Sequence, residues 1–255
     1  LTGTLTFNPD FSDSPLDERQ VNTSRFSLFI DETRDFFLQD AATFEFGGWN
    51  FHENANNARP FFSRNIGLAS GTPVSILGGG KLSGEYAGFG IGALSAMTAN
   101  QGTVPAQLLS VARITRPVFS ESRIGMIVTN GDPTGASENT ILGADFQHRD
   151  SNFLGDQVLQ TDFYYERSFS DIYGDDDSYG IALNLPNEPW GGRIHYKQVG
   201  EEFRPALGFA NRRGVRIYEG RVWNRNRFRD RSIRQAFYWA DYELITGLDN
   251  RTQSW

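Results

Sequence analysis

The sequence predicts an all-β protein: an antiparallel up-and-down transmembrane β-barrel with meander topology, or the N-terminal part of one. Apolar and polar residues alternate over several long stretches, and strict alternation favours strands over helices. The stretches follow one another without helix-length insertions, which is typical of antiparallel neighbours. The chain also has a mean hydropathy of -0.46, although 14% of its residues are aromatic. A membrane barrel combines both properties because lipid-facing apolar residues alternate with lumen-facing polar ones.

Composition excludes several classes of protein. The 255 residues include no cysteine, which excludes disulfides, thiolate metal sites and cysteine nucleophiles. The net charge of -7 argues against nucleic acid as a partner. No apolar run reaches the roughly 18 residues that a membrane-spanning helix needs. No charged segment followed by an apolar run marks a signal peptide, so we expect a processed protein or an excised piece.

The glycine-rich stretch GGGKLSGEYAGFGIGALSAM, residues 78–97, nearly matches two phosphate-binding patterns. The P-loop pattern fails because Leu82 stands where a hydroxyl is needed, and the dinucleotide pattern at residues 88–93 lacks a following helix. The stretch instead predicts two strands joined at Ala87-Gly88, with one apolar face and one face of small or charged residues. Glycines on one face of a strand mark a bend or the close approach of another part of the chain.

The remaining alternating stretches follow in order along the chain. They are residues 123–129, 142–149, 159–169, 179–185, 193–197 and 235–244. Turn-forming residues separate some of them, at 130–133, 173–177 and 186–189. We expect about ten strands in all.

The two faces of this sheet leave two architectures open. A soluble sandwich would turn its charged face to water and pack its apolar face on a second sheet. A membrane barrel would enclose the charges in a wet lumen and turn its apolar face to lipid, and the pattern favours this arrangement. The barrel therefore predicts that the rings of Phe163, Tyr165, Tyr238 and Tyr242 face outward.

Residues 1–60 alternate poorly and are predicted as an entry or plug-like segment that leads into barrel strands over residues 61–255. Residues 33–37 are expected to begin a short helix or a plug-like stretch inside the lumen; a plain connection between strands is the alternative. The acidic cluster at residues 10–18 has calcium-binding oxygens but no EF-hand spacing, so a solvated loop is expected. No metal or cofactor is predicted.

Six motifs together resemble a known family. They are TFNPDFSDSPLDERQVN (residues 6–22), RFSLFIDETRDFFLQDAATFEF (25–46), PFFSRNIGL (60–68), ILGGGKLSGEYAGFGIGAL (76–94), SRIGMIVTNGDP (122–133) and VGEEFRPALGFANRRG (199–214). They resemble bacterial outer-membrane proteins of unknown function, which carry an N-terminal carbohydrate-binding domain of the family-nine type and a long C-terminal β-barrel. The resemblance implies a place in the outer membrane, contact with its lipid and lipopolysaccharide, and the first part of such a barrel without the sugar-binding domain.

One basic ladder is the candidate site. It consists of residues that share one strand parity around Trp223, namely Arg221, Arg225, Arg227, Arg229 and Arg231. On a lumen face these side chains would attract anions and select solutes. Two alternatives are a grip on lipopolysaccharide phosphates and a hairpin tip with solvated arginines.

The function predicted from these features is the passive passage or export of a solute, with a glycan as the candidate. One alternative is a membrane-associated hydrolase acting on carbohydrate, for which Asp162 with Glu166, or Asp241 with Glu243, are the carboxylate pairs. A soluble all-β glycan-binding module is the other. No catalytic residue is predicted, because the three histidines are scattered and no HExxH or G-x-S-x-G motif occurs.

Overall fold

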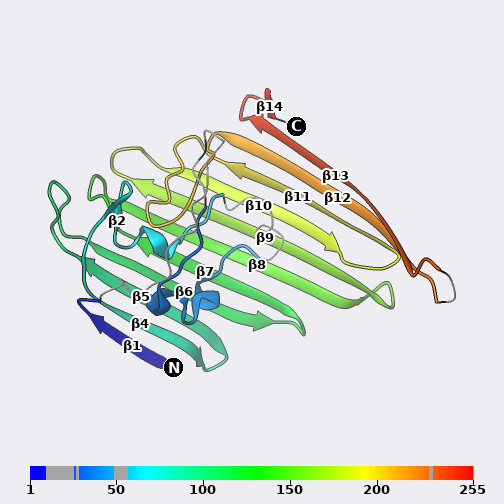
Figure 1. Ribbon diagram of the computed structural model, residues 1–255, viewed down its shortest axis with the longest axis horizontal. Coiled ribbons are helices and arrows are strands. Elements are labelled where there is room, and N and C mark those ends of the chain that lie inside the picture. Colours follow the sequence, from blue (N-terminus) through cyan, green and yellow to red (C-terminus); the bar gives the residue numbers. More distant parts are fainter. Residues whose placement is uncertain (10–25, 27–28, 49–56, 230–231, 255) are drawn as a thin grey trace.

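The computed structural model describes residues 1–9, 26, 29–48, 57–229 and 232–254. It contains one twelve-stranded antiparallel sheet in which neighbouring strands follow chain order, so the all-β, up-and-down prediction is confirmed (Figure 1). The strands are β1 (Thr2–Phe7), β4 (Ile76–Tyr86), β5 (Phe89–Thr98), β6 (Leu108–Val118), β7 (Ser122–Asn130), β8 (Asn139–Phe153), β9 (Gln157–Ser170), β10 (Asp176–Leu185), β11 (Trp190–Val199), β12 (Val215–Arg227), β13 (Gln235–Gly247) and β14 (Thr252–Ser254). Within the described ranges the sheet is not closed into a barrel: β1 and β14 are its two edges.

The described residues between β1 and β4 lie against one face of the sheet (Figure 1). We call residues 29–48 and 57–66 the inserted segment, the sheet face that it contacts the inner face, and the opposite face the outer face. The inserted segment contains the short helix α1 (Asp35–Leu38) and the 3-10 turns η1 (Ala41–Phe44) and η3 (Ser63–Asn65). A two-stranded ribbon of β2 (Leu68–Ala69) and β3 (Thr72–Pro73) follows it.

The alternation predicted from the sequence separates the two faces as expected. The rings on the outer face are exposed, at 45% for Phe163, 40% for Tyr165, 67% for Tyr238 and 58% for Tyr242. The inner face carries charged side chains that are buried, and these are Lys81, Arg113, Asp145, Asp162, Glu166 and Lys197. In the described residues, exposed apolar side chains therefore lie on the outer face, and buried charges lie on the inner face together with the hydrophobic core.

The glycine-rich stretch forms the β4–β5 hairpin, as predicted. Its turn residues Ala87 and Gly88 both have positive φ, 51° and 79°, which matches the twist of a tight hairpin. Glycines on the inner face leave room for side chains of the inserted segment. A Cβ at Gly92 would lie 3.0 Å from Cε1 of Phe44, and a Cβ at Gly143 would lie 2.7 Å from Cζ of Phe46. The expected close approach of another part of the chain is thus made by phenyl rings of the inserted segment.

Three details refine the predicted organisation. Residues 2–7 form β1 and pair with β4, so the 1–60 segment already contains one strand of the sheet. Helix α1 begins at Asp35 and packs on the inner face, which answers the question left open for residues 33–37. The loop expected at residues 173–177 ends earlier, because Asp176 and Asp177 already pair in β10. The acidic cluster at residues 10–18 lies outside the described residues.

The hydrophobic core lies between the inner face and the chain that covers it. One cluster joins Phe37, Phe44 and Phe46 of the inserted segment to inner-face residues such as Leu94 and Ile127. A second cluster lies beneath the connection of residues 200–214. This connection also binds the inserted segment through its backbone, since the Phe62 N–H donates to the Leu207 carbonyl at 2.7 Å. In the part of the chain described, no helix is long and apolar enough to cross a membrane.

Candidate functional site

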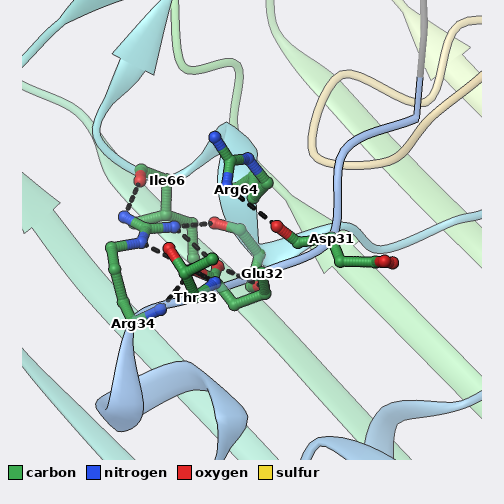
Figure 2. A network of polar contacts seen from close by, with 7 residues as sticks. Asp31, Glu32, Thr33, Arg34, Arg64 and Ile66 are labelled. Carbon is green, nitrogen blue, oxygen red and sulfur yellow. Dashed lines mark hydrogen bonds and ion pairs between the residues drawn. The ribbon is translucent and has the colours of Figure 1, made fainter. Parts of the chain in front are cut away.

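A partly buried ion pair between Arg34 and Glu32 fixes the course of the inserted segment (Figure 2). Arg34 donates to both carboxylate oxygens of Glu32, at 2.8 and 2.7 Å, and to the carbonyls of Ile66 and Ser63 at 2.6 and 2.8 Å. The Ser63 hydroxyl donates to the same carboxylate at 2.6 Å. Burial alone would raise the pKa of Glu32, but the hydrogen bonds and charge of Arg34 outweigh it and hold that pKa below its ordinary value. The pair ties the two halves of the inserted segment together.

The cations of the inner face bind backbone carbonyls of the inserted segment. Lys81 Nζ, in β4, donates to the Phe36 carbonyl at 2.9 Å and also to the Gln39 carbonyl. Lys197 Nζ, in β11, donates to the Asn57 carbonyl at 2.9 Å. Burying an ammonium group requires such compensation. Each lysine therefore replaces its water shell with carbonyl groups from the segment.

Arg113 in β6 and Asp145 in β8 form a deeply buried ion pair. Their Nη1–Oδ1 distance is 2.6 Å, and the side chains are 1% and 2% exposed. Asp145 also accepts from the Gly47 N–H of the inserted segment at 3.2 Å, and the guanidinium lies over the Phe46 ring at 5.3 Å. Gly125, between the two strands, has no Cβ that would strike the guanidinium. The pair thus belongs to the part of the inner face that the inserted segment covers, which we call the seat of the segment.

A cavity of about 350 Å³ lies between the inserted segment and the inner face. Seven of its 20 lining residues are aromatic, with Phe29, Phe44 and Phe61 among them, and five are charged, including Glu32 and Lys197. This volume is at the lower end of those that hold small ligands. The described lining therefore mixes aromatic rings with charged and polar groups.

Three residues of the predicted arginine ladder, Arg221, Arg225 and Arg227, lie on the inner face, and each is paired with a carboxylate. Arg221 forms an ion pair with Asp241 of the neighbouring strand. Arg225 and Arg227 both form ion pairs with Glu188, which lies in the β10–β11 turn, at 3.0 and 2.9 Å. The hydrogen bond from Arg227 and, to a smaller extent, that from Arg225 lower the pKa of Glu188. Arg229 follows β12 in an exposed position, and Arg231 is outside the described residues. Arg221, Arg225 and Arg227 therefore form a row of ion pairs, which the sequence did not reveal because Glu188 lies in a turn.

A charged hollow of about 270 Å³ lies beside the ladder, between β11, β12 and β13. Its lining includes Arg193, His195, Glu219, Arg221 and Asp241. His195 Nε2 lies 3.2 Å from an oxygen of Glu219. His195 was not singled out from the sequence, although its parity with Arg193 and Lys197 places it on the charged face.

The two carboxylate pairs considered for hydrolysis have different surroundings. Asp162 and Glu166 are 5% and 0% exposed beneath the inserted segment, so a substrate has no direct access to them. Asp241 and Glu243 are exposed on the inner face, but Asp241 is engaged by Arg221. The described residues contain no cluster of three or more histidine or acidic side chains suited to a metal ion.

Comparison with known proteins adds no relative. No family model, no curated protein and no solved structure matches the chain.

Proposed function

We propose that the sheet is part of the wall of a β-barrel in a bacterial outer membrane, and that the space on its inner side passes a solute passively. The observation that carries this proposal is the orientation of the faces. Exposed apolar side chains cover the outer face from strand to strand, among them Leu82, Ile114, Met126, Leu142, Ile181 and Ile194. A soluble monomer rarely exposes an apolar area of this extent, because water penalises it.

The strand lengths support the same proposal. A tilted membrane-crossing strand needs about 9–11 residues. The ten strands from β4 to β13 have between 9 and 15 residues each. Lipid cannot satisfy the N–H and C=O groups of an open edge, so the proposal requires partners for β1 and β14. Further strands or another copy of the chain would supply them.

The inner face supplies the polar wall that a wet passage needs. The inserted segment covers part of it, whereas the inner-face side chains of β13 between residues 235 and 243 are largely exposed. Lumen polarity and width then select the solute, as in other pores. A glycan is the candidate solute, and outer-membrane lipid with lipopolysaccharide is the expected surrounding.

Reconstitution tests the proposal directly. The chain, purified in detergent, is added to a planar lipid bilayer, and stepwise increases in conductance are expected. Extraction without detergent as a stable monomer would favour the soluble glycan-binding module instead. A silent bilayer combined with the release of sugar from added polysaccharide would favour the hydrolase. Either result would overturn the passage function.

A further inference from the structure

Three aromatic side chains form a strip on the inner face of β12 and β13, toward the turn that joins these two strands. Trp223 lies opposite Trp239 across the two strands, and Phe237 stacks on Trp239 with ring centroids 5.2 Å apart and planes inclined by 24°. Trp239 is 59% exposed and Phe237 is 37% exposed. Their inner-face neighbours on these two strands, such as Arg221 with Asp241 and Glu219 with Glu243, are charged, so exposed rings are an exception in this part of the face.

Contacts with neighbouring residues hold Trp223 and Phe237 of the strip in place. The Trp223 ring lies over Gly191, where a Cβ would come within 2.3 Å of the ring, and its indole N–H donates to the Asn187 carbonyl at 3.3 Å. The guanidinium of Arg225 lies 4.6 Å from the centre of the Phe237 ring. These contacts hold flat apolar surfaces toward the inner side before any ligand arrives, which reduces the entropy lost on binding.

Paired charges border the strip on both sides. Arg221 with Asp241 lies at one end, and Arg225 and Arg227 with Glu188 lie at the other. The guanidinium and carboxylate groups retain hydrogen-bonding capacity, but most of their charge is cancelled within the pairs. The hollow of about 270 Å³ shares Arg221 and Asp241 with this border, so the strip continues into a polar recess.

We propose that the strip and the hollow together bind a neutral oligosaccharide. Sugar rings have apolar C–H faces that pack on exposed aromatic rings, and their hydroxyl groups both donate and accept hydrogen bonds at the rim. Ion pairs whose charges cancel provide such donors and acceptors without strongly attracting ions. The inference deepens and rests on the proposed function, because it takes the inner face to border a water-filled passage.

An anionic ligand fits this arrangement less well. Each of Arg221, Arg225 and Arg227 already binds a carboxylate, so an anion would have to displace Asp241 or Glu188. The aromatic rings would then have no part in binding. The two ligand classes consequently differ in which side chains they need.

Calorimetric titration of the full chain in detergent tests the site. The probes are maltohexaose, cellohexaose and xylohexaose, with tripolyphosphate as the anionic probe. At least one neutral probe is expected to bind, and Trp239→Ala should weaken it about tenfold. Tyr238→Ala is the matched control, because Tyr238 is the neighbouring residue of β13, is 67% exposed and lies on the outer face. It should leave the affinity unchanged.

Trp239→Phe keeps the aromatic surface and should retain most of the affinity, which guards against a misfolded alanine variant. The inference is overturned if no neutral probe binds, if Trp239→Ala and Tyr238→Ala weaken binding equally, or if tripolyphosphate alone binds. The titration measures sugar binding independently of conductance. Sugar binding without conductance would reject the passage function and leave the site, whereas conductance without sugar binding would reject the site alone.

Discussion

Substituting arginine for Ile194 separates a membrane-facing outer face from one that faces water. Ile194 is 63% exposed on the outer face and is the fifth of the ten residues of β11. A strand of this length extends about 33 Å. At a tilt of about 45° it spans roughly 23 Å, close to the apolar band of a membrane barrel, which is about 25 Å tall. Ile194 would therefore lie near the middle of the bilayer.

The expected cost follows from that depth. An arginine at the middle of the lipid-facing side of a barrel costs about 2–4 kcal/mol. The same change at a water-exposed position usually alters stability by less than about 0.5 kcal/mol. Urea unfolding of the chain in lipid vesicles, followed by circular dichroism, measures the difference in the free energy of unfolding. The two expectations differ by more than the error of such an extrapolation.

Ile233 provides the matched control for this substitution. It is 65% exposed, nearly the same as Ile194, but it precedes β13 and lies outside any strand. Ile233→Arg should cost at most about 1 kcal/mol, as near a membrane interface. Equal and small effects of Ile194→Arg and Ile233→Arg would refute the membrane-facing outer face.

Three other predictions concern the seat of the inserted segment. Arg113→Met or Asp145→Leu alone should cost about 3–5 kcal/mol of unfolding free energy and the double variant less than either, since only a single change leaves a buried charge unpaired; additive costs in urea unfolding would contradict the coupling. Gly143→Ala should cost about 1–3 kcal/mol by displacing Phe46, whereas Gly220→Ala, whose Cβ would have no neighbour closer than 3.7 Å, should be nearly neutral by the same assay. Because the pKa of Glu32 is lowered in the folded state, its contribution to stability is present above its ordinary value of 4.5 and is lost as pH falls through the lower folded pKa. Hydrogen-exchange protection factors of residues 29–48, which correct for the pH dependence of intrinsic exchange, should fall over that range in the parent chain. An equal fall in Glu32→Gln would assign the loss to other groups.

The sequence predicted the strands well because their signal is local. Side chains of one strand alternate between faces whatever the strand pairs with, so the stretches at 123–129 and 159–169 fall inside β7 and β9. The hairpin at Ala87-Gly88 was also local. The course of the inserted segment was not, since its anchors join positions far apart, as Lys81 does with the Phe36 carbonyl. No periodicity encodes such a contact.

The arginine ladder shows the same limit at the candidate site. Strand parity correctly placed Arg221, Arg225 and Arg227 on one face, but their net charge depends on partners in other segments. Glu188 reaches the ladder only because the register of β11 against β12 brings the β10–β11 turn beside Arg225. Unless that register is known, the sequence does not distinguish a row of ion pairs from a row of unpaired cations.

The inserted segment divides the inner face into a closed part and an open part, and energetics decide which part a solute would meet. Withdrawing the segment would expose Phe37, Phe44 and Phe46 of the buried cluster, at about 1.5–3 kcal/mol for each side chain. It would also strip Lys81 and Lys197 of the carbonyl groups that compensate their burial. Movement along the exposed inner face of β12 and β13 incurs neither cost. A solute on the inner side would therefore travel beside Trp239 and the paired arginines while the segment stays in its seat.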